Sequence, residues 1–146
     1  MKAVLMSLKS KWLAAILNGE KTVEVRKRAP LYPQPFKVYL YCTKEYHDAN
    51  DYLEIHCPDG KIYPAHGKVC GEVECVSIVD MIPPYYYSQN GTGMSFEALD
   101  HYAGGKKLSY MALRNPTIYD KPKELSDFGL SRAPQSWQYV EVKNDK

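Results

Sequence analysis

Prolines and glycines divide the chain into short segments, and this punctuation most constrains the fold. Ten prolines and nine glycines are spread over 146 residues. Between them lie short runs such as Phe36–Cys42 (FKVYLYC), in which apolar and polar residues alternate as in a half-buried strand. Helical spacing occurs only in residues 11–18 and 96–105. Short strands with two short helices predict an α+β fold, a small, mostly antiparallel, partly closed β-barrel.

The residues that begin and end these segments follow known capping and strand-breaking rules. Ser10 and Ser95 are expected to cap the two helices, and Gly19 is expected to end the first. The segment 115–135 contains three prolines and is predicted to be a loop. The expected strands span residues 2–7, 22–28, 36–42, 68–82, 108–113 and 136–142.

A polar, acidic segment at 43–67 interrupts the strand pattern. It contains Pro58–Lys61 (PDGK) between two short apolar runs, and Asp-Gly is a favoured pair for a tight hairpin turn. We therefore expect one domain, residues 1–146, with a hairpin-like insert at about 43–67. This insert is also a candidate surface for a protein partner.

Composition excludes several classes of protein. No apolar run approaches the roughly 20 residues that span a bilayer, and the N-terminus lacks the pattern of a secretory signal, so a cytoplasmic protein without membrane contact is expected. The cysteines form no CxxC pair. The nearest approach to a metal set is His56, Cys57, His66 and Cys70, whose spacing matches no standard zinc pattern. Neither a metal nor another cofactor is expected.

Charge is unevenly distributed although the formal net charge is only +2. Residues 1–28 hold seven Lys or Arg against two acids, a net of +5, and residues 104–146 hold eight against five, a net of +3. Residues 29–103 hold four against ten, a net of −6. The two basic ends would form one anion-facing surface if they met in space.

The segment after the first helix concentrates the functional signal. Val23 and Val25 are expected to face the core, which places Glu24, Arg26 and Arg28 together on the other strand face. Lys21 stands at the entrance of this strand. One interpretation is an exposed Glu–Arg ion pair of little energetic value. The other is an ordered Lys–Glu–Arg cluster whose cations receive a phosphate or a base edge.

These residues resemble a family motif. Gly19, Lys21, Glu24 and Arg26 match the G-x-K-x-x-E-x-R signature of the ASCH family, a branch of the PUA-like β-barrels. The flanking segments follow in the family's order: KVYLYCT, GKVCGEVECVSIVD, LSYMALRNPTIYDKP and APQSWQYVEV. The resemblance covers nearly the whole chain apart from the insert.

The resemblance implies a β-barrel with a cleft between barrel and helices, lined by the motif residues. ASCH proteins are generally proposed to bind RNA, so the implied ligand is RNA, another single-stranded nucleic acid or a modified nucleotide. Some small members resemble amidohydrolases of acylated cytidine that use a lysine, a threonine and a glutamate, and others are reported as ribonucleases. In an enzyme, Lys21 and Glu24 would be the catalytic residues, although Glu24 stands where that subgroup has threonine.

Further candidates come from the rest of the chain. In family members the segment before the last strand lies near the cleft, so Gln135 and Ser136 are candidates for hydrogen bonds to a base edge. Trp137 is either a core residue or a stacking platform. Tyr85–Tyr87 are either stacking faces or a cover for the barrel end. The family's third catalytic acid would fall near Gln89 and Asn90, with Glu97 and Asp100 as nearby acids. Separately, Arg114 and Asn115 are weaker polar candidates.

The pair of Lys21 and Glu24 bears on whether the site binds or reacts. A buried lysine loses its proton more readily, which would suit a base or nucleophile. A neighbouring carboxylate favours the charged ammonium and opposes that loss. The sequence therefore favours binding over catalysis and leaves the choice between them open.

Overall fold

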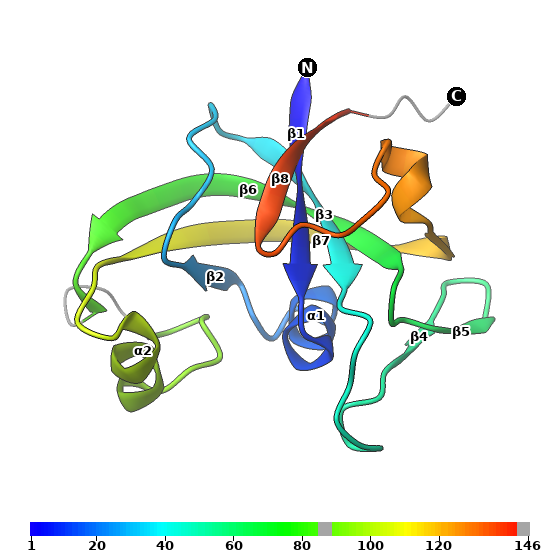
Figure 1. Ribbon diagram of the computed structural model, residues 1–146, viewed down its shortest axis with the longest axis horizontal. Helices are drawn as coiled ribbons and strands as arrows, with labels where there is room; N and C mark the ends of the chain where they lie inside the picture. The colour runs from blue at the N-terminus through cyan, green and yellow to red at the C-terminus, as the bar shows by residue number, and fades with distance from the viewer. Residues whose placement is uncertain (85–88, 143–146) are drawn as a thin grey trace.

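The computed structural model describes residues 1–84 and 89–142, and its body is a six-stranded sheet in the order β2-β7-β6-β3-β1-β8 (Figure 1). β1 and β3 are parallel, and the other neighbouring strands are antiparallel. An α+β fold with a mostly antiparallel sheet and two helices is thereby confirmed, while closure into a barrel stays a prediction. The strands are β1 (Lys2–Leu8), β2 (Val23–Arg26), β3 (Phe36–Cys42), β6 (Val69–Ile82), β7 (Leu108–Lys123) and β8 (Trp137–Glu141).

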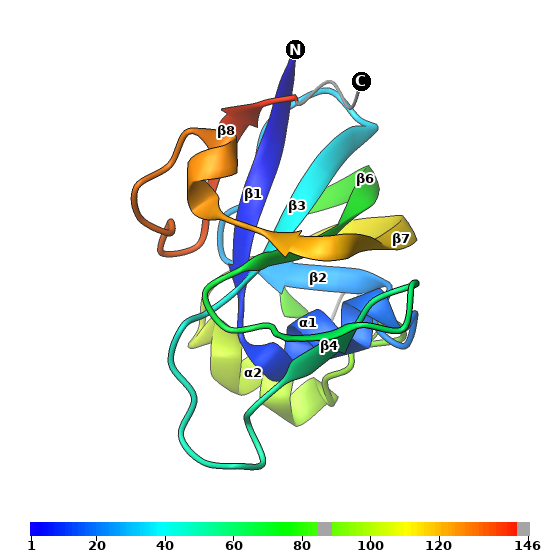
Figure 2. The same cartoon turned by 90° about the vertical axis from the view of Figure 1, so that its right-hand side faces the viewer.

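The two helices, α1 (Ser10–Leu17) and α2 (Phe96–Ala103), lie at the same end of the sheet, where β1 ends (Figures 1 and 2). The Ser95 side chain accepts a hydrogen bond from the Ala98 amide at 3.1 Å, which confirms the predicted cap of α2. Gly19 follows α1 with φ of 85°, also as predicted. The prediction for Ser10 is wrong: it is the first helical residue, and its hydroxyl donates to the Asp51 carbonyl at 2.6 Å.

The core lies on both faces of the central strands. On one face, alternate residues of β1 and β3 pack against the apolar side of α1. On the other face, Leu5 and Tyr39 pack against Phe128 of the short 3-10 helix η2 (Leu125–Phe128). Both strands are therefore buried almost throughout. A third cluster joins Val23 and Val25 to α2.

The prediction of a long loop at 115–135 is wrong for the first half of that segment, because β7 continues to Lys123. β2 pairs with β7 only from Ser109 to Ala112, so the remainder of β7 is an edge with one hydrogen-bonded neighbour. Prolines are tolerated on such edges, because their missing backbone N–H would be needed only to pair with a second neighbouring strand. Pro116 and Pro122 therefore do not end the strand, although its register with β6 shifts several times.

The insert contains the predicted hairpin, formed by β4 (Glu54–His56) and β5 (Ile62–Pro64) as a separate two-stranded sheet. Gly60 of the PDGK turn has φ of 88°. Buried side chains of Ile55, Cys57 and Ala65 belong to the main core cluster. The insert is therefore packed onto the body. Within residues 1–84 and 89–142, no helix has the length and apolar character needed to cross a membrane.

Candidate functional site

Lys21, Glu24 and Arg26 form one cluster of charges in the structure. Lys21 Nζ lies 3.4 Å from Glu24 Oε1, and Arg26 Nη2 lies 2.7 Å from Glu24 Oε2. The side chains are only 2%, 7% and 13% exposed, respectively. The cluster is therefore buried, and the alternative of an exposed ion pair is wrong.

Local structure explains how these charges come together. The α1 carbonyl of Ala15 accepts from the Lys21 amide at 2.9 Å, which fixes the lysine just before β2. Along β2, Val23 and Val25 pack against α2 and Tyr110. Glu24 lies between them in sequence and faces the other way, as strand alternation predicts.

The Lys21 ammonium also donates to the carbonyl of Thr92, in the segment before α2. Thr92 is itself held in place, since its hydroxyl donates to the Gln89 carbonyl at 2.6 Å and accepts from the Met94 amide at 3.1 Å. Sequence reasoning missed Thr92. In the sequence, Thr92 could have been recognised by its position between Gly91 and Gly93, both of which adopt positive φ.

Arg26 connects three strands of the sheet. Its Nη1 donates to Ser136 Oγ at 2.9 Å, beside β8, and its Nη2 donates to the Ser7 carbonyl of β1 at 2.9 Å. Its Nε donates to Glu24 at 2.8 Å. Each guanidinium nitrogen therefore has a protein acceptor. Arg26 and Ser136, both predicted as ligand contacts, have structural partners here, and Arg26 orients Glu24.

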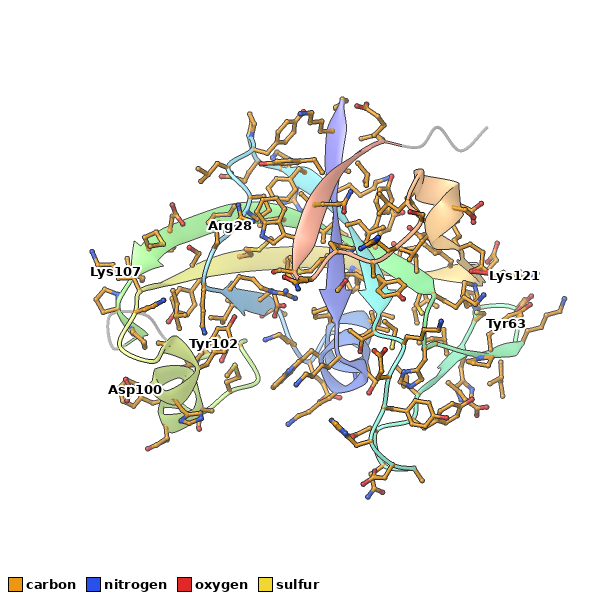
Figure 3. The ribbon with its side chains drawn as sticks, in the orientation of Figure 1. Arg28, Tyr63, Asp100, Tyr102, Lys107 and Lys121 are labelled. Carbon is orange, nitrogen blue, oxygen red and sulfur yellow. The ribbon has the colours of Figure 1, made fainter. Side chains whose placement is uncertain are left out.

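A pocket of about 340 Å³, which we call the Lys21 pocket, opens onto this cluster. Trp12 of α1 and Tyr102 of α2 contribute aromatic rings, and Lys21 Nζ lies 4.8 Å from the centre of the Trp12 ring. Figure 3 places Tyr102 between α2 and β2. Neither ring was among the site residues predicted from the sequence. The pocket is lined by Ser7, Leu8, Lys9, Trp12, Lys21, Glu24, Val25, Arg26, Thr43, Met94, Tyr102 and Gln135.

Burial lowers the pKa of Lys21 from its ordinary value of 10.5, and this outweighs the opposing effect of Glu24. The carboxylate and its hydrogen bond raise the pKa, while the neighbouring Arg26 adds to the lowering. The expectation that the effect of Glu24 on the Lys21 pKa would outweigh that of burial is therefore corrected. Desolvation of the ammonium is the larger influence.

Other predicted residues lie outside the pocket lining. Arg28 is exposed and stacks 4.8 Å above the Trp137 ring, whose Nε1 donates to the Arg28 carbonyl at 3.0 Å. Trp137 is half-buried and packs against the main core. Gln89 and Asn90 are exposed, as are Glu97 and Asp100 on α2. Tyr85–Tyr87 lie outside the described residues.

Two of the residues considered for a metal site, His66 and Cys70, have hydrogen-bond partners within the protein. His66 Nδ1 donates to the Thr43 carbonyl at 2.9 Å, and Nε2 accepts from the Leu53 amide at 3.0 Å. Cys70 Sγ donates to the Ala65 carbonyl at 3.6 Å, and burial raises the pKa of this thiol. Over the described part of the chain, no group of three or more His, Cys, Asp or Glu residues is placed to hold a metal ion.

The two basic ends of the chain are neighbours in the sheet, since β1 pairs with β8 and β2 pairs with β7, but the lysines of residues 104–146 do not gather on one surface. Figure 3 places Lys107 and Lys121 at opposite ends of the long axis of the molecule. The cations close to the Lys21 pocket come instead from the N-terminal region. Lys11 Nζ lies 4.7 Å from the Trp12 ring centre, and Lys27 Nζ lies 5.0 Å from that of Tyr102.

Solved structures of an ASCH protein resemble this fold over nearly its whole length. ASCH from Zymomonas mobilis gives a TM-score of 0.68 at 21% identity, with 95% of this chain and 87% of that chain covered. A tyrosine-to-phenylalanine mutant of ZmASCH gives 0.70 at 21% identity, covering 97% and 91%. A serine-to-alanine mutant gives 0.68 at 20%, covering 95% and 88%. No protein-family model and no curated protein matches the chain. The chain therefore has the ASCH-domain fold.

Proposed function

We propose that the Lys21 pocket binds a nucleotide of single-stranded RNA, or a modified nucleotide, within a PUA-like barrel. The observation that carries this proposal is the buried Lys21–Glu24 pair in a pocket that also presents the rings of Trp12 and Tyr102. Protein sites for single-stranded nucleic acids combine aromatic faces with cations in this way. A pocket of about 340 Å³ is also within the usual range for small ligands.

The charges predict how a nucleotide would lie. Glu24 is a carboxylate that accepts hydrogen bonds, so it favours a base edge with N–H donors and repels a phosphate. The amino group of cytosine is such a donor. Gln135, at the exposed side of the pocket, offers an amide that both donates and accepts. The base would therefore enter the pocket, with its edge directed at Glu24.

The phosphates would lie at the rim. Lys9 lines the pocket, and Lys11 and Lys27 lie beside its Trp12 and Tyr102 rings. All three lysines are exposed, and none forms an ion pair within residues 1–84 and 89–142. Contacts between such lysines and phosphates release counterions, so affinity falls as salt rises.

Binding is tested by fluorescence anisotropy with a labelled single-stranded RNA at several salt concentrations. Lys27→Ala is expected to weaken binding and to reduce the slope of log affinity against log salt by about 0.7. Lys121→Ala is the matched control, because this exposed lysine is not part of the pocket lining and lies on the opposite side of the molecule from Tyr102 (Figure 3). An affinity that does not depend on salt, or equal losses in the two variants, would contradict the proposal.

A second candidate function is hydrolysis of an acylated cytidine or of RNA. It is favoured by the lowered pKa of Lys21, which increases the neutral fraction of a buried amine at the pocket. A neutral amine keeps two N–H groups besides its lone pair, so it could act as a base or nucleophile while still donating to the Thr92 carbonyl. Glu24, held by Arg26, is placed to exchange a proton with it.

Hydrolysis is tested by incubating the purified protein with N-acylated cytidine and, separately, with labelled RNA, and resolving the products. Lys21→Ala is expected to abolish turnover while retaining the circular dichroism spectrum of the folded protein. Absence of product at high protein concentration would exclude this second function and leave the binding proposal intact.

A further inference from the structure

A second hollow adjoins the Lys21 pocket on the side of the insert. It has a volume of about 510 Å³ and lies between the start of α1 and the first part of the insert. Lys9, Trp12 and Thr43 line both hollows, so the two are contiguous. We call this second space the insert hollow. It is lined by Lys9, Ser10, Lys11, Trp12, Thr43, Glu45, Tyr46, His47 and Asp51.

Tyr46 presents an exposed but supported ring in this hollow. The residue is 50% exposed, although it is a large aromatic side chain. Its ring centre lies 4.6 Å from that of His66 and 5.1 Å from that of Tyr52. His66 is in turn fixed by hydrogen bonds to the backbone of Thr43 and Leu53. Little side-chain freedom would be lost if a flat ligand stacked on Tyr46.

The charges of the insert hollow are divided between its two sides. Lys9 and Lys11 lie on the α1 side, whereas Glu45 and Asp51 belong to the insert. A polyanion would therefore follow the α1 side. Lys9 borders both hollows, where a phosphate that links two nucleotides would lie.

We propose that the insert hollow is a second nucleotide subsite, with Tyr46 stacking on the base and Lys11 contacting a phosphate. The ligand is then a single-stranded polynucleotide of at least two nucleotides, rather than a free nucleotide. The inference rests on the proposed function, because the first nucleotide occupies the Lys21 pocket. The insert thereby extends the binding surface of the domain.

The test compares the affinities of a cytidine mononucleotide and of the cytidine dinucleotide and tetranucleotide, measured by calorimetry. The wild type is expected to bind the dinucleotide on the order of tenfold more tightly than the mononucleotide, since each stacked base adds affinity. Tyr46→Ala should remove this gain and leave mononucleotide affinity unchanged. Tyr46→Phe keeps the ring and should keep the gain.

Lys11→Ala should weaken binding of the tetranucleotide and reduce its salt dependence. Lys61→Ala, in the hairpin turn of the same insert, should not, because Lys61 is exposed and outside both hollows. The second subsite is overturned if the wild type binds the mononucleotide and the dinucleotide with equal affinity. It is also overturned if Tyr46→Ala and Tyr46→Phe have the same dinucleotide affinity. In both cases the proposed function stands. That result would leave the face of the insert to a protein partner. If no probe binds, both proposals fail.

Discussion

At the scale of single residues, the site depends on one carboxylate shared by two cations. Burying a charge is costly unless it is paired and hydrogen-bonded. Glu24 meets this condition with one oxygen near Lys21 and the other bonded to Arg26. Removing Glu24 leaves two buried cations without their anion, whereas each cation keeps backbone acceptors on Thr92 or Ser7.

Glu24→Ala is expected to lower the free energy of unfolding by about 3–5 kcal/mol, because it breaks a buried ion pair. Urea denaturation measured by tryptophan fluorescence checks this value. Glu74→Ala is the matched control, since Glu74 also pairs with an arginine but lies on the surface. Its unfolding midpoint should stay near that of the wild type. Equal losses in the two variants would show that burial of Glu24 is not the cause.

The lowered pKa of Lys21 predicts a particular dependence of stability on pH. Between that lowered value and 10.5, the unfolded chain binds more protons at this residue than the folded one. The contribution of Lys21 to the free energy of unfolding therefore rises with pH across this window. The difference between wild type and Lys21→Met, measured by urea denaturation from pH 8 to pH 10.5, should change in favour of the wild type. A constant or opposite difference would mean that the pKa is not lowered.

At the scale of elements, the insert is held to the body by a few apolar side chains. Its hairpin is a separate two-stranded sheet, so backbone pairing does not join it to the main sheet. The attachment comes from the buried inner side of the hairpin and from the Ser10–Asp51 hydrogen bond. The position of Tyr46 beside the Lys21 pocket depends on this packing.

Ile55→Ala is expected to lower the free energy of unfolding by about 2–5 kcal/mol, because Ile55 is only 5% exposed in the main core. Ile62 is 50% exposed on the partner strand of the same hairpin, so Ile62→Ala should have little effect. Both values can be measured by thermal and urea unfolding. Similar values for the two variants would indicate that the hairpin is not packed against the body as described.

At the scale of the whole molecule, the sheet brings its two edge strands to one place. β2 and β8 are at opposite ends of the strand order, yet Arg26 of β2 donates to Ser136, directly before β8. It also donates to Ser7 of β1. The curvature of the sheet thus assembles the Lys21 pocket from segments that are more than 100 positions apart in sequence.

The reactivity of the four buried cysteine thiols is a measure of how well the folded molecule excludes solvent from its core. All of them are free and buried, and burial raises the pKa of each thiol, so little reactive thiolate is present at neutral pH. A thiol reagent such as DTNB is expected to react slowly with the native protein and with all four thiols in denaturant. Ser126→Cys, at an exposed position, should add one rapidly reacting thiol. Rapid reaction of the unmodified native protein would contradict the described burial.

Local patterns predicted most of the elements, since alternation and capping depend on near neighbours. The cap at Ser95, the turn at Gly60 and the strand at Phe36–Cys42 are local features of this kind. The predictions that proved wrong concern positions where contacts between residues distant in sequence determine the local structure. Ser10 does not cap the helix, and its hydroxyl donates instead to the distant Asp51 carbonyl. Pro116 is tolerated in β7 because β2 pairs with β7 only as far as Ala112.

By itself, the sequence predicted that the chain forms short strands with two helices, and that Lys21, Glu24 and Arg26 form one cluster of charges. Their spacing along a strand is enough to place Glu24 and Arg26 on one face. Only the tertiary structure decided that this face is buried, that Arg26 is occupied by protein acceptors, and that burial lowers the pKa of Lys21. Desolvation depends on everything packed around a charge, and those neighbours come from distant parts of the chain.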